Sequence, residues 1–398
     1  MKFYYEHEDY LNVPNGTRTY TDLDRFYGYQ HPIFELNHTD EIIWNYCIEG
    51  YLDIYDYIMN NFTHFDKVFQ TIREYPNVKL VFSSFHESQS YKISMLYRFL
   101  SNVKKRYGLS YNQLNVVTIN LKENHYKRDV LSISKPYLLG TIADSFNLVM
   151  SGVNNYDANN IGLITTDSYL NTKKSKFFLN YNRNAMRYHR KMTLLWLLKN
   201  DMLKDTLYSA MMIDTDLKEY VFDFHNDEIN DLADYAPEFI KMGVKLLDWD
   251  VESDEDETIF TQTCSNDMNH YNETVFSIIS ETSYQSMSLT LTEKCFKSFA
   301  NCHPFIVMGD MGAHQKLKEL GFELYDDLID YTFDSIESIP HRLNATYKEI
   351  RRIYELGEDY IIEWYKNNID KIERNKNKIL TFSNEEFMNQ TLEKIKNG

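Results

Sequence analysis

Short apolar runs alternate with amphipathic segments along most of this chain, and no other feature of the sequence restricts its fold as strongly. In the first half, the runs VKLVF at 78–82 and NVVTI at 115–119 have the length and the β-branched content of buried strands. Apolar residues at helical spacing predict helices over 54–69 and 93–103. Because strands that alternate with helices favour parallel βαβ units, the first half is predicted to be an α/β domain.

The second half repeats this alternation and ends in a charged helical segment. Strands are predicted at 176–180, 274–279 and 304–308, and helices at 184–203, 291–301 and 313–320. Gly321 suits the position just after the last of these helices. The candidate linkers are the polar stretches 154–160 and 165–175. We therefore predict an N-terminal α/β domain at 1–170, a second α/β domain at 171–340, and C-terminal helices at 341–398 that pack back on the first domain.

The charge balance and the composition exclude several classes of protein. With 42 basic and 59 acidic residues among 398, the net charge is −17, so most of the surface repels polyanions and acidic membranes. A hydrophobic content of 43% excludes wholesale disorder. Four cysteines are too few for a disulfide scaffold, and no run reaches the roughly 18 apolar residues of a membrane span. Together with an N-terminus that lacks an apolar signal core, these features predict a cytoplasmic protein with no membrane span.

Three arginines stand at the start of the helix predicted over 184–203. Arg183, Arg187 and Arg190 are spaced i, i+4 and i+7, which places them on one face of a helix. The positive end of the helix dipole disfavours cations there, so the arrangement is costly unless an anion binds among them. A phosphate or diphosphate fits both the helix N-terminus and the bidentate geometry of arginine. A solvated basic face, paired with the acidic loop at 248–257, accounts for the same pattern.

A second group of charged residues follows the strand predicted at 274–279. Glu281 comes directly after this strand, at the edge where ligands gather in open α/β sheets. The pattern Thr290-x-x-Glu293 then opens the next helix as a capping box, which gives Glu293 a purely structural explanation. Lys294 follows as a cation at a helix start. A carboxylate beside a cation at this place also suits the ribose and the phosphate of a nucleotide.

Two further motifs follow predicted strands, and neither is specific by itself. Gly309-x-x-Gly312 lies between the strand at 304–308 and the next helix. Glycines there permit close approach of the backbone to a ligand, and they also form tight turns. In the first half, Glu87 follows the strand at 78–82. A carboxylate at that edge can act as a general base toward a hydroxyl, or it can belong to a surface loop.

Taken together, two segments of the second half resemble a known family. The first runs from 178 to 190 and the second from 280 to 309, followed by 317–322. The residues that carry the likeness are Phe178, Leu179, Asn180, Asn182, Arg183, Arg187, His189, Arg190, Ser280, Glu281, Thr292, Glu293, Lys294, Phe296, Lys297, His303 and Gly309. In this combination they resemble glycosyltransferase-like proteins of tailed phages and large DNA viruses. The segment from 281 to 309 is also similar to the donor-binding motif of α1,3-fucosyltransferases.

The resemblance implies the GT-B fold, in which two Rossmann-like domains face each other with the active site between them. It covers about residues 176–335 well and the first half loosely. In this fold the second domain binds the sugar donor. The resemblance implies that Glu293 holds the hydroxyls of the donor ribose, and that Lys294 with Arg183 or Arg187 neutralises the diphosphate.

The remaining residues of the implied site divide into binding and catalytic groups. The donor-binding set also includes His189, Arg190 and Gly309. The resemblance places Glu281 near the transferred sugar, and Glu87 matches a first-domain carboxylate that serves as the base. The segment that follows Glu281 departs from the fucosyltransferases, so the donor sugar does not carry over as fucose.

The expected reaction is transfer of a sugar from a nucleotide-diphosphate sugar to an acceptor hydroxyl, with inversion. Negative charge builds on the departing diphosphate, and cationic side chains stabilise that charge, so the expected mechanism needs no metal and no other cofactor. The acceptor is expected to be a glycan or a hydroxymethylated base in viral DNA. Basic segments at 104–106 and 122–128 are candidates for DNA contacts. For a viral protein, the place of action would be the host cytoplasm.

Two other functions fit parts of the sequence. A metal-dependent GT-A glycosyltransferase uses an aspartate pair, for which Asp214-Thr-Asp216 and Asp248-Trp-Asp250 are candidates. A non-catalytic nucleotide- or sugar-binding viral module would use the same cationic groups without a base. Activity that persists in EDTA argues against the first alternative. Nucleotide binding without transfer or donor hydrolysis argues for the second.

Overall fold

The structure, a computed structural model, describes residues 2–7, 42–47, 54–84, 93–110, 113–118, 131–134, 163–182, 187–210, 231–243, 268–284, 289 and 291–380. The chain divides into two compact units, one formed by Met1–Tyr137 with Ser383–Gly398 and the other by Leu138–Phe382. Each unit contains a parallel sheet with helices packed on it, so the predicted α/β class is confirmed. The division between the units falls earlier than the expected boundary between 170 and 171.

The helix α6 (Thr166–Asn171) belongs to the second unit, although the expected boundary places most of it in the first. It occupies part of the polar stretch 165–175, for which the sequence predicts a linker, and Thr165 closes its N-terminus with a capping box. The hydroxyl of Tyr169 donates to the carbonyl of Val275 at 2.6 Å, which anchors the helix to the second sheet. The linker prediction is therefore wrong for this stretch. The other candidate linker, 154–160, lies outside the described residues.

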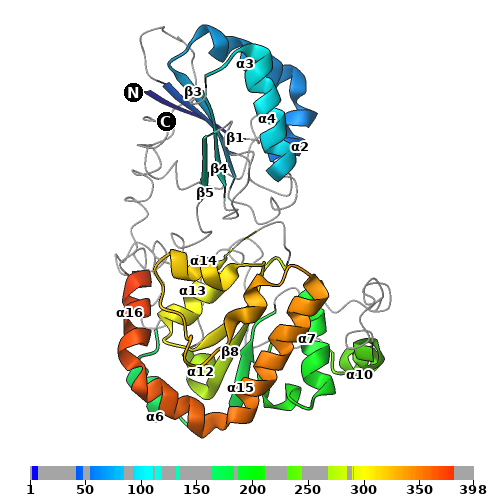
Figure 1. The fold of residues 1–398 in the computed structure, drawn as a ribbon, viewed down its shortest axis with the longest axis vertical. Helices are drawn as coiled ribbons and strands as arrows, with labels where there is room; N and C mark the ends of the chain where they lie inside the picture. Colours follow the sequence, from blue (N-terminus) through cyan, green and yellow to red (C-terminus); the bar gives the residue numbers. More distant parts are fainter. Residues whose placement is uncertain are drawn as a thin grey trace, which may run out of the picture. The chain divides into compact units, whose positions relative to one another are not determined.

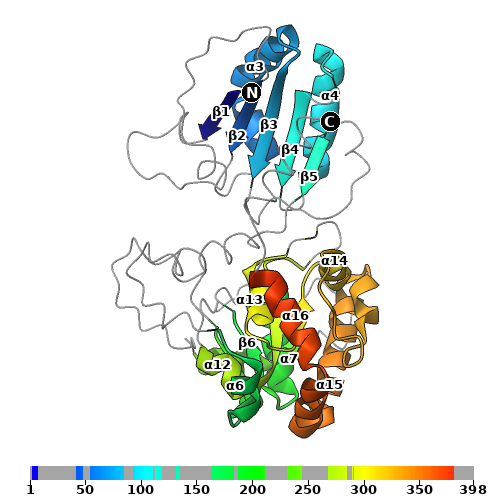
Figure 2. The same ribbon diagram turned by 90° about the vertical axis from the view of Figure 1, so that its left-hand side faces the viewer.

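The first unit has a five-stranded parallel sheet in which strands adjacent in the sequence also lie side by side. Its strands, in this order, are β1 (Lys2–His7), β2 (Ile42–Cys47), β3 (Val78–Ser84), β4 (Leu114–Thr118) and β5 (Leu131–Ser134). Right-handed crossovers then place the connecting helices on one face of the sheet. Figures 1 and 2 show that face covered by α2 (Ile54–Asn60), α3 (Phe62–Glu74) and α4 (Ile93–Tyr107).

Aromatic side chains fill the space between these helices and the sheet. The ring of Phe65 on α3 is fully buried, with its centroid 5.6 Å from that of Phe82 on β3. Two helices replace the single one predicted over 54–69, because Asn61 interrupts it and donates from Nδ2 to the carbonyl of Tyr57 at 3.0 Å. The predictions of β3, α4 and β4 are confirmed, whereas β1, β2 and β5 were not predicted.

The second unit has a four-stranded parallel sheet in the order β7-β6-β8-β9. The strands β6 (Lys176–Asn180), β8 (Thr274–Ser280) and β9 (Phe305–Met308) confirm the three predicted ones. The short β7 (Thr206–Tyr208) covers the first part of an apolar run. All residues of β8 are buried, as is typical of a central strand with helices on both faces.

The order of these strands reverses once, and the reversal creates a topological switch point. The chain runs from β6 to β7 on one side and then returns across β6 to β8. Right-handed connections therefore put α7 (Tyr188–Lys199), which follows β6, and α13 (Glu293–Ala300), which follows β8, on opposite faces, as Figure 1 shows. The switch point lies between the carboxyl ends of β6 and β8, where open α/β sheets bind ligands. In the first unit the order of the described strands does not reverse.

The described C-terminal helices, α15 (Ile339–Asn367) and α16 (Ile369–Leu380), pack on the second unit, whereas the whole segment 341–398 is expected to return to the first. α15 contacts α7, β8 and β9, and α16 packs on α13. The ring of Tyr347 on α15 stacks on Trp196 of α7 with centroids 4.7 Å apart. Burial of its apolar face against α7 and the sheet accounts for the position of α15. Residues 383–398 are outside the described part of the chain.

Shorter elements complete the second unit. They are α10 (Ala236–Lys241), α12 (Met268–Glu273), α14 (Ala313–Glu319) and the 3₁₀ turns η5 (Leu203–Asp205), η6 (Asp231–Tyr235) and η7 (Tyr331–Ser335). The prediction of α14 is confirmed, and Gly321 just after it has a φ of 85°, a conformation that favours glycine. None of the described helices is both long enough and apolar enough to cross a membrane.

Candidate functional site

A buried amide joins the two strand ends at the switch point. Asn180 is the last residue of β6 and is fully buried. Its Nδ2 donates to the carbonyl of Ile278 at 2.5 Å and lies 3.2 Å from the hydroxyl of Ser280, the last residue of β8. This contact fixes the carboxyl ends of β6 and β8 relative to each other, so the residues that follow them share one edge of the sheet.

The carbonyl group of Glu281 anchors the first turn of α7 to that edge. It accepts hydrogen bonds from Nε2 of His189 at 2.7 Å and from Arg190, whose Nη2 lies at 3.0 Å and Nε at 3.3 Å. Both donors are almost completely buried. Arg190 therefore holds the backbone of the strand end, and a role in positioning α7 explains it better than direct contact with a ligand.

The carboxylate of Glu281 caps the N-terminus of α13. One oxygen accepts from the backbone N–H of Thr292 at 2.9 Å and from Sγ of Cys295 at 3.3 Å. The other accepts from the hydroxyl of Thr292 and from the N–H of Thr282 at 3.2 Å. The side chain is fully buried, and both of its oxygens already accept hydrogen bonds from the protein, so its capacity is used within the framework. Glu281 fixes the start of α13 and the first turn of α7 together, which makes it a positioning residue.

Replacing Glu281 by glutamine tests this positioning role. The amide would present a donor to groups that are themselves donors, so we expect Glu281→Gln to lower the free energy of unfolding by about 1–3 kcal/mol. Urea unfolding checks the stability. A direct catalytic role would instead leave the stability unchanged while turnover is lost.

Two cationic side chains lie on this framework and are partly exposed. Arg187 donates from Nη1 to the carbonyl of Thr282, just after β8. Lys294 donates from Nζ to the hydroxyl of Thr292 at 2.9 Å. Thr282 follows Glu281 in the chain and also donates to its carboxylate, and the hydroxyl of Thr292 donates to the same carboxylate. The framework thus brings together two positive charges that are more than 100 positions apart in the chain.

The surroundings of His189 are consistent with the hydrogen bonds that hold the two cations near Glu281. Burial lowers the pKa of His189 well below its usual value, and the positive charges of Arg190, Arg187 and Lys294 lower it further. The neutral ring donates through Nε2 to the carbonyl of Glu281, which leaves its Nδ1 as an acceptor. The neighbouring charges that lower this pKa are positive, so an anion bound at this edge would interact favourably with them.

The start of α7 adds to the same potential. The helix begins at Tyr188, and Arg187 occupies its N-cap in an extended conformation. The side chain of Arg187 does not cap this terminus, and the first turn contains no acidic residue. The positive end of the helix dipole therefore acts together with Arg187 and Lys294. A phosphate or a diphosphate is the ligand that such an arrangement favours.

Asn182 lies just beyond the end of β6 and is fully buried. Its backbone N–H donates to the hydroxyl of Ser209 at 2.9 Å, and its Nδ2 donates to Oδ1 of Asn180. Oδ1 of Asn182 is also buried, and no described residue donates a hydrogen bond to it. The switch point therefore contains an acceptor that the described residues leave unsatisfied.

Gly309 follows β9 beside Glu281 and is required for packing. A Cβ atom at this position would lie 3.5 Å from Cβ of Glu281 and 3.0 Å from Cγ1 of Val307. The absence of a side chain allows β9 and Glu281 to approach closely. The close approach is to side chains of the protein itself, so packing accounts for Gly309. Gly312 has a φ of 86° at the N-cap of α14, which also favours glycine.

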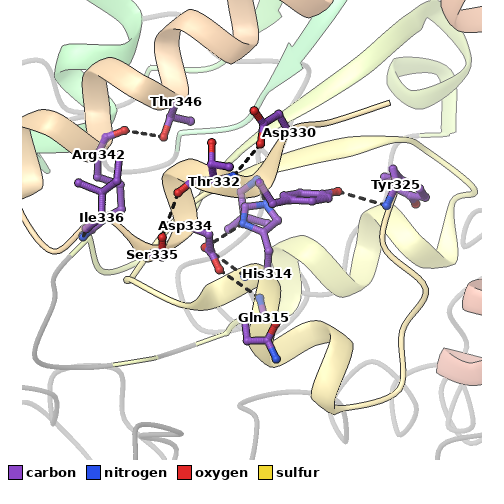
Figure 3. A network of polar contacts seen from close by, with 12 residues as sticks. His314, Gln315, Tyr325, Asp330, Thr332, Asp334, Ser335, Ile336, Arg342 and Thr346 are labelled. Atoms are coloured by element: carbon purple, nitrogen blue, oxygen red, sulfur yellow. Dashed lines mark hydrogen bonds and ion pairs between the residues drawn. The ribbon is translucent and has the colours of Figure 1, made fainter. Parts of the chain in front are cut away.

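A buried histidine fixes the start of α14, as Figure 3 shows. His314 donates from Nδ1 to Asp334 at 3.0 Å, and its Nε2 accepts from the backbone N–H of Val307 at 3.0 Å. Val307 belongs to β9, the last strand in the order of the described sheet, so the histidine satisfies a donor that no described strand takes. Asp334 also accepts from the N–H of Gln315 at 3.1 Å, which caps the helix. This network holds the turn after β9 in place.

The structure corrects both predicted helix starts. α7 begins at Tyr188 and not at residue 184, so Arg187 precedes the helix and the predicted arginine face does not form as expected. α13 begins at Glu293 with Thr292 as its N-cap, so the capping box from Thr290 is wrong. The reason is that the carboxylate of Glu281 takes over the capping of this helix.

Several predicted site residues lie outside the described part of the chain. These are Glu87, Arg183, the aspartate pairs Asp214/Asp216 and Asp248/Asp250, and the basic segment 122–128. Glu293 is placed at the first position of α13, but its side chain is not among those described. The basic segment 104–106 forms the last turn of α4. Among the described residues no group of three or more metal-type ligands occurs.

A stack of three side chains beside the cations could not be predicted from the sequence. Tyr284 stacks on His189 with ring centroids 5.4 Å apart, and the guanidinium of Arg342 lies 4.6 Å from the centroid of the tyrosine ring. Arg342 comes from α15 and donates to the carbonyl of Ile336 at 2.6 Å. An isolated tyrosine and an arginine near the C-terminus carry no local signal, and only the packing of α15 on this unit brings them together.

Comparison with protein-family models, with curated proteins and with solved structures gives no match to this chain.

Proposed function

We propose that the protein is a GT-B glycosyltransferase that transfers a sugar from a nucleotide-diphosphate sugar to an acceptor hydroxyl. The observation that carries the proposal is that Arg187 bonds to the carbonyl of Thr282 and Lys294 to the hydroxyl of Thr292, beside the start of α7 at the switch point of the second sheet. In this proposal the second unit is the donor-binding domain, and the first unit supplies contacts to the acceptor. The acceptor is a glycan or a hydroxymethylated base in viral DNA.

The chemistry follows from where negative charge develops. Cleavage of the bond between the sugar and the diphosphate leaves an additional negative charge on the departing nucleotide. Arg187, Lys294 and the N–H groups at the start of α7 stabilise that charge more strongly in the transition state than in the bound substrate. His189, Arg190 and Glu281 hold these groups in position.

The remaining roles are part of the proposal as well. Glu87 removes the proton of the acceptor hydroxyl, so that attack opposite the leaving diphosphate inverts the configuration of the sugar. Glu293 holds the hydroxyls of the donor ribose, and Arg183 adds to the diphosphate contacts. Exclusion of water prevents hydrolysis of the donor.

Thermal unfolding in the presence of UDP-glucose, GDP-mannose and dTDP-glucose tests donor binding. A ligand at 100 times its Kd stabilises the folded state by about 2.7 kcal/mol, so we expect one of these donors to raise the Tm by about 5 °C or more. Release of the nucleoside diphosphate, measured with and without EDTA, then tests turnover. Absence of a shift with every donor contradicts the proposal, and activity that EDTA abolishes favours the GT-A alternative.

A non-catalytic binding module is the second candidate function. The hydrogen bonds of Glu281 favour it, because protein donors already occupy both oxygens of this carboxylate at the cationic site. The variant Glu87→Gln separates the two functions. Loss of product formation with retained nucleotide binding supports the enzyme, whereas nucleotide binding by the unaltered protein with neither transfer nor hydrolysis supports the binding module.

A further inference from the structure

The unsatisfied oxygen of Asn182 carries an inference about which ligands the site selects. The side chain is fully buried, and among the described residues only its Nδ2 has a hydrogen-bond partner. A buried acceptor without a partner is unfavourable, since it has lost its hydrogen bonds to water. The group is therefore expected to gain a partner when the site is occupied.

The orientation of this amide follows from its neighbours. Asn180 must direct its Nδ2 toward the carbonyl of Ile278, because a carbonyl only accepts hydrogen bonds. Its Oδ1 then needs a donor, which Nδ2 of Asn182 provides. The opposite orientation of Asn182 would place two acceptors against each other. Oδ1 of Asn182 is consequently the atom without a partner, and the assignment rests on the hydrogen-bond network.

The position of Asn182 links it to the cationic site. Asn180 bonds to Asn182 on one side and lies 3.2 Å from the hydroxyl of Ser280 on the other. Ser280 precedes Glu281, whose carbonyl binds the first turn of α7. Asn182 therefore belongs to the same carboxyl edge as the cations and lies directly beyond the end of β6.

The chemistry of the amide oxygen restricts what can face it. A phosphate oxygen is an acceptor at neutral pH and would be repelled, so the diphosphate itself does not satisfy Asn182. A hydroxyl group donates to an amide oxygen. In a nucleotide sugar, hydroxyls flank the diphosphate on both sides, on the ribose and on the transferred sugar.

We propose that Oδ1 of Asn182 accepts a hydrogen bond from a sugar hydroxyl of the bound ligand and so distinguishes a nucleotide sugar from diphosphate alone. This inference rests on the proposed function, because it assigns the hydroxyl to the nucleotide-sugar donor. A site that hydrogen-bonds a substrate hydroxyl discriminates strongly against ligands that lack it, since its own buried group is then left unpaired.

The variant Asn182→Ala tests the proposal by isothermal titration with three probes: inorganic diphosphate, UDP and UDP-glucose. If the unaltered protein binds GDP-mannose or dTDP-glucose more tightly than UDP-glucose, that donor is used in place of UDP-glucose. Its nucleoside diphosphate is then used in place of UDP. We expect the affinity for the nucleotide sugar to fall by about 10- to 100-fold and the affinity for inorganic diphosphate to change by less than about twofold. An equal loss for the nucleoside diphosphate and its sugar identifies a ribose hydroxyl, whereas a loss confined to the nucleotide sugar identifies a hydroxyl of the transferred sugar.

A matched control and a second variant keep the result interpretable. Ser209→Ala removes the acceptor of the Asn182 backbone N–H but leaves the amide oxygen in place. It is expected to change the affinities for diphosphate and nucleotide sugar by the same factor. If Asn182→Ala does not fold, Asn182→Ser serves instead, because its shorter side chain does not reach the position of the amide oxygen.

The outcomes separate this inference from the proposed function. If the unaltered protein binds a nucleotide sugar and Asn182→Ala binds it with the same Kd, the role of Asn182 is overturned and the proposed function stands. A loss of the same factor for inorganic diphosphate and nucleotide sugar also overturns the role of Asn182, since it reports structural damage. If the unaltered protein binds no nucleotide sugar more tightly than inorganic diphosphate, the proposed function fails and this assignment fails with it.

Discussion

Replacing both Arg187 and Lys294 by methionine is expected to weaken the binding of nucleoside diphosphates by at least about 100-fold. A hydrogen bond to a charged group contributes about 1.5–3 kcal/mol, and each 1.4 kcal/mol corresponds to about a tenfold change in Kd. Two such contacts to a diphosphate therefore account for the expected loss. Methionine keeps much of the length of both side chains while removing their charge.

The stability of the folded protein is expected to change little in this double variant. Both side chains are partly exposed, and each makes its described contact with a neutral group, Arg187 with the carbonyl of Thr282 and Lys294 with the hydroxyl of Thr292. Isothermal titration with UDP and with inorganic diphosphate measures the binding, and urea unfolding measures the stability. A large loss of stability would mean that the two cations are part of the framework and not of a binding surface.

A matched control removes the same number of charges at the opposite edge of the sheet. Lys173 precedes β6 and Lys204 precedes β7, and both are exposed. The pair Lys173→Met and Lys204→Met lowers the net charge by the same amount at the amino ends of these strands. We expect this control to change the affinity for UDP by less than about twofold at physiological salt, where exposed charges are screened beyond about 8 Å. Equal effects in both double variants would attribute the binding to overall charge alone.

The strands of the second sheet could be predicted from the sequence because their signals are local. β6, β8 and β9 are continuous apolar runs that fit between two helical layers, and the structure places them within one residue of the predicted bounds. The prediction failed for β1 and β2, for which no strand was proposed. The order of the strands, and with it the switch point, follows from long-range pairing that the local pattern does not contain.

The candidate site was predictable in its residue types but not in the roles of its residues. Arg187 and Lys294 stand at helix starts, and their positions in the sequence indicate an anion site. Glu281 also follows a strand, but a carboxylate there can face a ligand or cap a neighbouring helix. Its partner Thr292 is 11 residues away, and two threonines compete for the capping position. Only the tertiary structure shows that the carboxylate is buried against α13.

The buried histidines make the second prediction with a large effect: acidification destabilises the protein before its carboxylates titrate. Burial lowers the pKa of His303 to about 3 from an ordinary value of 6.5, and burial also lowers that of His189. His303 is fully buried, with Nδ1 2.8 Å from the hydroxyl of Ser277 and Nε2 3.1 Å from the carbonyl of Thr274. Both rings stay neutral in the folded protein at pH values where they are protonated in the unfolded chain.

The sign of the effect follows from proton binding. Below pH 6.5 the unfolded chain takes up a proton at each of these histidines and the folded protein does not, so the free energy of unfolding falls as the pH falls. The two sites together are expected to lower it by about 3 kcal/mol between about pH 6.5 and pH 5. This contribution is fully present above pH 6.5, and that of His303 continues to be lost until the pH approaches 3.

Urea unfolding at a series of pH values, compared between variants, checks this prediction. His303→Asn removes one of the two sites, so the decrease between pH 6.5 and pH 5 is expected to be about half as large, even though the variant is less stable at every pH. His341→Gln is the matched control, because His341 is exposed on the first turn of α15, and we expect the full decrease in this variant. If the decrease is equally steep in His303→Asn and in the unaltered protein, then His303 does not titrate as its burial requires. The buried His303 is tolerated because its ring is uncharged near neutral pH and both of its nitrogens have hydrogen-bond partners in β8.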